Sequence, residues 1–155
     1  MTSMKNLIVF FLLLCGTTVV AQKTEAELVR SAFQLEKKAL VADYLQMSND
    51  EAEKFWPIYN QYEAQRIDAF TRRFKLIDTY LVNIEKGIAE VHADEMVKES
   101  AAIQKMELEL RQKYYKLIKK SISLPVAARF YQVEDAINVA VRNELYGNLP
   151  VAVRK

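Results

Sequence analysis

The chain has 155 residues, with 22 Lys and Arg, 20 Asp and Glu, and a formal net charge of +2. A charge so close to zero excludes a nucleic-acid binder that works through bulk electrostatics, and one Cys with one His cannot build a Cys/His zinc site. Because only 3 Gly and 3 Pro are present, turns are few, which favours a few long helices over a many-stranded β fold in one domain.

Residues 1–21 have the features of a secretory signal peptide. A lysine near the start precedes an apolar run that is too short to cross a bilayer, and we expect cleavage after Ala21. The alternatives are a buried N-terminal helix and a membrane anchor; a lipoprotein is excluded because Leu14 precedes Cys15, where such sites have a small residue. The prediction is an exported protein without stable membrane insertion after cleavage, in which residues 22–155 form a single all-helical domain.

Apolar residues recur at helical spacing through that domain. The first helix is expected over about residues 25–45. Ser48 and Glu51 then have the spacing of a capping box, which starts a second helix that continues until Gly87. Pro57 lies inside this second helix, so we expect either a kink just before it or a short turn that leads into another helix.

Two further helices complete the prediction, which is an all-α fold of four long amphipathic helices. The third starts near Asp94. The fourth starts at Ser123-Leu124-Pro125, with Ser as the N-cap and Pro in the first turn, and Gly147 ends it. The expected apolar stripes include Phe55, Tyr59, Tyr62, Phe74, Ile77 and Leu81 in the second helix, Val97, Ile103, Met106, Leu110, Tyr114 and Leu117 in the third, and Val126, Phe130, Val133, Ile137 and Ala140 in the fourth.

A shift of 75 residues superposes the starts of the second and fourth helices. Both copies have the order Ser, Ala, basic residue, Phe, aromatic residue and aliphatic residue at matching spacings. Chance similarity between amphipathic helices would produce part of this pattern; two equivalent corners of a pseudo-symmetric pair of hairpins would produce all of it. The matched residues are Ser48, Ala52, Lys54, Phe55, Trp56 and Ile58 with Ser123, Ala127, Arg129, Phe130, Tyr131 and Val133.

The segment Met47-Ser48-Asn49-Asp50-Glu51 resembles the LTxxQ motif of the Spy/CpxP family, whose members are small, periplasmic, all-helical stress proteins. That family carries the motif twice, at helix starts; here the second copy would be residues 124–128, which keep the Leu and lose the Thr and Gln. Residues 51–59 are also similar to uncharacterised exported proteins of Bacteroidetes-type bacteria, some of them labelled sensors of ECF-type sigma factors. The motif and structural residues are Met47, Ser48, Glu51, Phe55, Trp56, Pro57, Ser123, Leu124, Pro125 and Phe130.

This resemblance implies a protein secreted across the inner membrane into the periplasm. It implies a hairpin or cradle arrangement of four helices in an antiparallel homodimer that binds unfolded or misfolded proteins without ATP. The alternative is a sensor or regulator of an envelope stress pathway that acts through one protein partner. A third possibility, heavy-metal sensing, has only His92 in its favour.

A basic run closes the third helix with no acidic residue among its members. Cations at a helix C-terminus complement the helix dipole, which explains the run without a function; alternatively, it attracts acidic clients or an anionic membrane surface. The aromatic residues are either core packing or partly exposed stacking surface. The candidate client-binding or partner-binding residues are Arg66, Arg72, Arg73, Arg111, Lys113, Lys116, Lys119, Lys120, Trp56, Tyr115 and Tyr131.

Catalytic chemistry has little support in the sequence. The serines discussed above lie at helix caps, and His92 with Asp94 and Glu95 is the only hint of an acid/base group or a metal ligand set. Three pairs of glutamates are spaced i, i+2, so their side chains point apart on a helix. We therefore expect no enzyme activity, no cofactor and no metal site, and a protein as the partner in place of a nucleic acid.

Overall fold

The computed structural model of the protein describes residues 34–147, 149 and 150. The predicted signal peptide and the beginning of the first predicted helix lie outside the described residues. The chain divides into two compact units, Met1–Tyr44 and Leu45–Lys155. The first described residues, 34–45, are helical.

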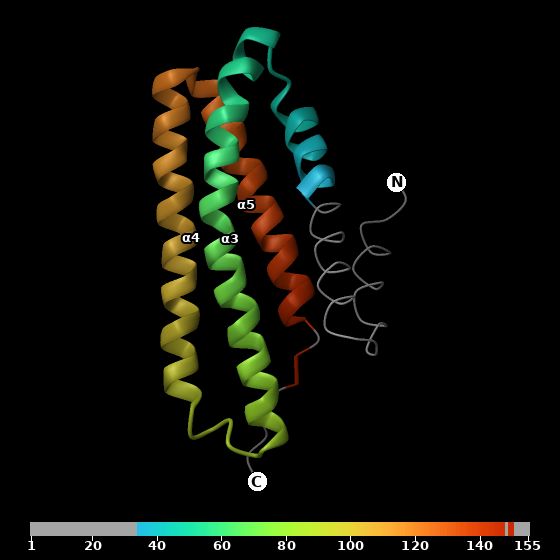
Figure 1. The fold of residues 1–155 in the computed structure, drawn as a ribbon, viewed down its shortest axis with the longest axis vertical. Coiled ribbons are helices and arrows are strands. Elements are labelled where there is room, and N and C mark those ends of the chain that lie inside the picture. The colour runs from blue at the N-terminus through green and yellow to red at the C-terminus, as the bar shows by residue number, and fades with distance from the viewer. Residues whose placement is uncertain (1–33, 148, 151–155) are drawn as a thin grey trace, which may run out of the picture. The chain divides into compact units, whose positions relative to one another are not determined.

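The second unit contains three long helices, α3 (Asn49–Glu85), α4 (Ala93–Ser121) and α5 (Leu124–Tyr146). They alternate in direction, so α3 and α5 run parallel and α4 runs antiparallel to both of them (Figure 1). α4 packs against each of the other two. The described residues contain no strand, which confirms the predicted all-α fold. No helix in this part of the chain combines the length and the apolar character needed to cross a bilayer.

The predicted starts of the second and fourth helices, which are α3 and α5, are confirmed. The hydroxyl of Ser48 accepts a hydrogen bond from the backbone N–H of Glu51 at 3.3 Å, and the Glu51 carboxylate accepts one from the backbone N–H of Ser48 at 3.0 Å. These two bonds form the capping box that starts α3. At the start of α5, the Ser123 hydroxyl accepts a hydrogen bond from the N–H of Val126 at 3.4 Å, and Pro125 lies in the first turn.

Gly87 ends α3 as predicted, in a Schellman motif. Its φ of 68° lies in the left-handed region that favours glycine. The N–H of Gly87 donates to the carbonyl of Ile84 at 3.0 Å, and the N–H of Ile88 donates to the carbonyl of Asn83 at 2.9 Å. At the end of α5, Gly147 stays in the right-handed helical region and its N–H donates to the carbonyl of Asn143 at 2.9 Å.

Pro57 does not divide α3, which continues without a break over 37 residues. The expectation of a short turn leading into another helix is therefore wrong. A proline leaves the carbonyl four residues earlier, here that of Glu53, without its helical donor. Pro57 and Glu53 are both exposed, so water reaches this side of the helix, while Phe55 and Tyr59 on either side of the proline are fully buried and hold the helix in place.

The buried stripes differ from the apolar stripes that the sequence predicts. In α3 most of the buried positions follow one another every three or four residues, but two of these are arginines, while Phe74 is only half-buried and Leu81 is 37% exposed. In α4, Val97 is 67% exposed and Arg111 is buried. Charged residues enter the stripes because ion pairs inside the unit compensate them, as described below. The buried stripe of α3 is Phe55, Tyr59, Tyr62, Arg66, Ala69, Arg73 and Ile77, and that of α4 is Ile103, Arg111, Tyr114 and Ile118.

The internal repeat corresponds to two helix starts that lie side by side. The Ser123 hydroxyl donates to the Glu51 carboxylate at 3.3 Å, so Glu51 takes part in the caps of both α3 and α5. The rings of Phe55 and Phe130, equivalent positions in the repeat, lie 6.3 Å apart between centroids. The two helices run parallel (Figure 1), and matched residues of the repeat lie close together at their adjacent starts.

Candidate functional site

Three of the arginines predicted to bind clients lie inside the second unit. Arg66 is 7% exposed, Arg73 2% and Arg111 8%. These three guanidinium groups therefore lack the exposure that a direct client-binding role would require. Each has an acidic partner, because a guanidinium taken out of water is tolerated only where a carboxylate compensates its charge.

The two buried arginines of α3 form ion pairs at different levels of that helix. Arg66 contacts Glu63 on the same helix, with Nε to Oε1 at 2.9 Å and Nη2 to Oε2 at 3.2 Å. Arg73 contacts Glu107 of α4 at 2.6 Å, and its other terminal nitrogen donates to the hydroxyl of Tyr146 of α5 at 2.6 Å. Burial by itself would lower the pKa of both guanidinium groups, but the neighbouring glutamates outweigh it and raise each pKa above its ordinary value.

Two further arginines connect neighbouring helices. Arg111 contacts Asp135 of α5 at 3.0 Å and lies over the ring of Tyr131, with 5.0 Å between the guanidinium carbon and the ring centroid. Arg72, about 39% exposed, donates to both carboxylate oxygens of Glu99 of α4 at 2.8 to 3.0 Å. These arginines are engaged in holding the helices together.

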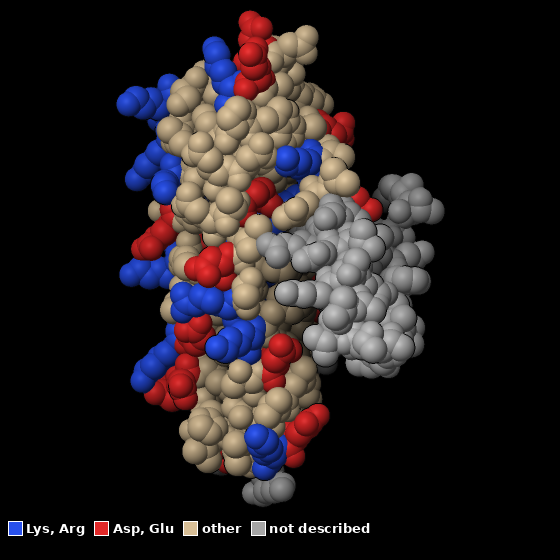
Figure 2. All heavy atoms as spheres, in the orientation of Figure 1, with Lys and Arg blue, Asp and Glu red and all other residues tan. Residues whose placement is uncertain are grey.

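The four predicted lysines, in contrast, lie on the surface of α4 near its C-terminal end; we call Lys113, Lys116, Lys119 and Lys120 the basic end of α4. All four are exposed. Lys113 donates to the side-chain oxygen of Gln65 at 3.0 Å, and the other three have no ion-pair partner among the described residues. In Figure 2, basic side chains project along this edge of α4, and acidic side chains alternate with them only further along the helix.

The predicted surface aromatics are half-buried, so each combines packing with some exposed ring. Tyr115 and Tyr131 form an edge-on pair across α4 and α5, with 5.9 Å between ring centroids. Tyr115 lies one helical turn before Lys119, so this pair adjoins the basic end of α4. Trp56 packs edge-on against Phe55 at 5.2 Å and Tyr59 at 5.6 Å.

Glu134, which was not among the residues predicted from the sequence, is fully buried in α5. Its two carboxylate oxygens accept hydrogen bonds from the hydroxyls of Tyr59 and Tyr62 of α3, each at 2.9 Å. Burial is the main cause that raises the pKa of each tyrosine above the ordinary value, and the negative charge of Glu134 is the next. The repeat could have indicated this contact, because a shift of 75 residues matches Glu134 with Tyr59, its hydrogen-bond partner.

His92 lies at the start of α4, where its Nδ1 is 3.6 Å from a carboxylate oxygen of Glu95. Within residues 34–147 and 149–150, no three His, Cys, Asp or Glu side chains are grouped as a metal site would need. This geometry gives the heavy-metal hypothesis no additional ligand.

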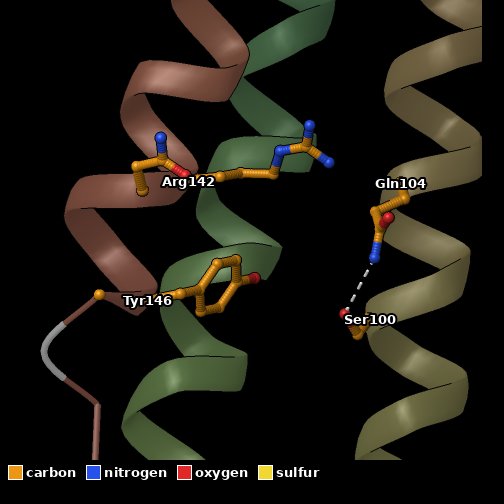
Figure 3. A pocket seen from close by; sticks show the side chains of 6 residues that line it. Ser100, Gln104, Arg142 and Tyr146 are labelled. Atoms are coloured by element: carbon orange, nitrogen blue, oxygen red, sulfur yellow. Dashed lines mark hydrogen bonds between the residues drawn. The ribbon is translucent and has the colours of Figure 1, made fainter.

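A groove between α4 and α5 was not predicted (Figure 3). We call it the α4–α5 groove. It lies toward the end of the unit opposite the basic end of α4, and Arg142 is the only charged residue among the described residues that line it. The lining residues are Ser100, Gln104, Arg142, Asn143, Tyr146 and Gly147.

Comparison of the chain with protein-family models, with curated proteins and with solved structures gives no match in any of the three. Any functional assignment therefore depends on the chemistry of the surfaces described above.

Proposed function

We propose that this protein is an exported, non-enzymatic helical protein that binds unfolded or misfolded proteins weakly and without ATP. The observation that supports this most directly is the basic end of α4, where exposed lysines without acidic partners among the described residues adjoin the Tyr115–Tyr131 ring pair. Exposed aliphatic side chains extend the same region, since Leu117 is 37% exposed and Leu124 is 53% exposed.

Such a surface suits an unfolded chain as its ligand. Lysine stems cover apolar segments while their ammonium groups stay in water, and tyrosine rings contact apolar and polar groups alike. The charges also attract acidic segments from a distance of about 10 Å at ordinary ionic strength. Binding should therefore be weak, general and sensitive to salt.

The proposal includes the predicted export and homodimer. Exposed aliphatic residues on two helices support a further packing surface, since Val97 is 67% exposed, and Leu108 and Val139 are each 41% exposed. Mass measurement of the protein purified from the periplasm should give a chain that begins at Gln22. Light scattering of the same sample should give the mass of a dimer; a monomer at all concentrations would remove the dimer from the proposal.

In the decisive test, an unfolded client protein aggregates in the presence of increasing amounts of this protein, at low and at high salt. The measured quantity is the suppression of aggregation. The substitutions Lys116→Gln and Lys120→Gln together should weaken the suppression of aggregation. The matched control is Lys98→Gln with Lys105→Gln, which removes two positive charges from the same helix where Asp94 and Glu109 pair with them. This control should leave suppression nearly unchanged.

Suppression that weakens with salt and depends on the basic end of α4 would support the proposal. No suppression at several-fold excess, or equal suppression by both double variants, would contradict the assigned surface. Recovery of one folded partner in stoichiometric amount, without any suppression, would favour the sensor of an envelope stress pathway instead.

A further inference from the structure

Arg142 is the exception among the arginines of residues 34–150. Five others are held by partners in the described structure, and Arg129, for example, donates to the backbone carbonyl of Leu45 at 2.6 Å. Arg142 has no hydrogen bond or ion pair in the described structure, although its side chain is half-buried and lies beside other polar side chains. The arginines with partners are Arg66, Arg72, Arg73, Arg111 and Arg129.

The side chain of Arg142 lies in the α4–α5 groove together with hydrogen-bonding groups from both helices. Arg142 and Tyr146 are one turn apart on α5 and extend toward α4, and Ser100 and Gln104 are one turn apart on the facing side of α4 (Figure 3). Asn143 adds a side-chain amide to the lining.

Two hydroxyls in the groove accept hydrogen bonds from protein side chains and so keep their own hydrogen for a ligand. The Tyr146 hydroxyl accepts from Arg73 at 2.6 Å, and the Ser100 hydroxyl accepts from the Gln104 amide at 3.3 Å. Neither hydroxyl donates to a protein acceptor in the described structure. Each of these two hydroxyls can therefore donate its hydrogen to a ligand, as can each N–H of the Arg142 guanidinium.

The described residues that line the groove carry a single unit of charge. Arg73, which lies behind Tyr146, is neutralised by Glu107 at 2.6 Å, and none of these lining residues is an Asp or Glu. Among them, Arg142 therefore supplies the one uncompensated positive charge. A ligand that carries one negative charge would balance it, whereas a doubly charged phosphate would leave one charge without a partner.

We propose that the α4–α5 groove binds a carboxylate, which Arg142 holds with paired hydrogen bonds and the hydroxyls of Tyr146 and Ser100 assist. A planar carboxylate matches the geometry of a guanidinium. Its source is either a small free carboxylic acid or the C-terminal carboxylate of a peptide. This site is separate from the basic end of α4, and the inference does not depend on the proposed function.

The test is a nuclear magnetic resonance titration of isotope-labelled protein, purified after expression of the complete chain. Three probes are added: butyrate, N-acetyl-dialanine with a free carboxylate, and the same dipeptide as its C-terminal amide. We expect saturable shifts of backbone amides in residues 100–104 and 142–147 with one or both acids, and none with the amide. Binding of the dipeptide acid but not butyrate would identify a peptide terminus as the source, and stronger binding of butyrate would identify a small acid.

Three variants show whether Arg142 is responsible. Arg142→Gln should weaken binding about tenfold or more, since it removes a charge-assisted hydrogen bond, and Arg142→Lys should keep part of the affinity. Lys116→Gln, which removes the same charge from the basic end of α4, should bind as the unaltered protein does. The dispersion of the amide spectrum confirms that each variant is folded.

Absence of saturable shifts, equal binding by Arg142→Gln, or binding of the amide as strongly as the acid would each overturn this proposal. None of these results would alter the aggregation assay, in which Arg142→Gln should behave as the unaltered protein. Failure of this site and failure of the proposed function are therefore separable.

Discussion

At the scale of single residues, Glu51 combines the caps of two helices in one carboxylate. It accepts hydrogen bonds from the backbone N–H and the hydroxyl of Ser48, and from the hydroxyl of Ser123. The backbone bond from Ser48 is the main cause that lowers the pKa of Glu51 below its ordinary value of 4.5. The folded state therefore favours the ionised carboxylate more than the unfolded state does.

This lowered pKa predicts an acid-dependent loss of stability. The contribution of Glu51 is present above its ordinary pKa and is lost as the pH falls through the lower value of the folded state. Urea unfolding at several pH values between about 6 and 3 should show that Glu51→Gln flattens the acid side of the stability curve. Glu53→Gln, an exposed control in the same turn, should not flatten it; equal curves for both variants would contradict the assigned role of Glu51.

The raised pKa values of Tyr59 and Tyr62 predict the opposite dependence, a loss of stability at alkaline pH. Burial raises the pKa of both hydroxyls above the ordinary value of 10.0, with the charge of Glu134 as the next cause. Their contribution to stability is fully present below that ordinary value and is lost as the pH rises above it, because only the unfolded chain ionises them readily.

An alkaline titration would show this effect. Ultraviolet absorbance of tyrosinate should reveal a group of tyrosines that ionise only as the helical circular dichroism disappears. Tyr59→Phe should reduce this late-ionising group by one, although loss of a donor to the buried Glu134 also lowers the free energy of unfolding by about 1–3 kcal/mol. Ionisation of every tyrosine while the helices remain intact would show that these hydroxyls are not buried as described.

At the scale of helices, α3 tolerates Pro57 at a cost in stability. A proline in a helix interior is about 3 kcal/mol less favourable than alanine, because it lacks an N–H and its ring contacts the preceding turn. Pro57→Ala would restore a donor for the Glu53 carbonyl and should raise the free energy of unfolding by about 1–3 kcal/mol. Chemical denaturation measures this change. A decrease would mean that the packing of Phe55 and Tyr59 depends on a bend at the proline.

The helix bounds could be predicted from the sequence because helix ends depend on local chemistry. Ser48 with Glu51, Ser123 with Pro125, and Gly87 each specify a cap through residues that are neighbours in the chain. Local chemistry also explains why the basic end of α4 could be predicted, since the exposure of lysines at the end of a helix does not depend on distant parts of the chain.

The interior could not be predicted in the same way, because its charged residues depend on partners far away in sequence. Arg73 is buried since Glu107 and Tyr146 lie against it, and Glu134 is buried since Tyr59 and Tyr62 donate to it. A stripe predicted from one helix alone therefore names apolar neighbours of these charged residues as the buried positions. For the same reason the sequence did not indicate the α4–α5 groove, which two helices form together.

At the scale of the whole second unit, Arg73 joins all three helices. It extends from α3 to Glu107 of α4 and Tyr146 of α5, with both contacts at 2.6 Å. Arg73 is 2% exposed and the Glu107 side chain 15% exposed, so water screens this pair little. Removing one partner of such a pair leaves a buried charge without compensation, whereas replacing both with apolar residues of similar size is often tolerated.

Arg73→Ala should therefore lower the free energy of unfolding by about 3–5 kcal/mol, measured by urea denaturation followed by circular dichroism. Combining Arg73→Met with Glu107→Leu should recover most of that loss, because no charge then remains buried without a partner. A loss as large in the double variant as in Arg73→Ala would mean that the directed bonds from Arg73 to α4 and α5 hold the helices in register. A small loss in Arg73→Ala would instead mean that the ring contacts of Phe55, Tyr59, Tyr62 and Phe130, toward the other end of the unit, hold the helices together without the ion pair.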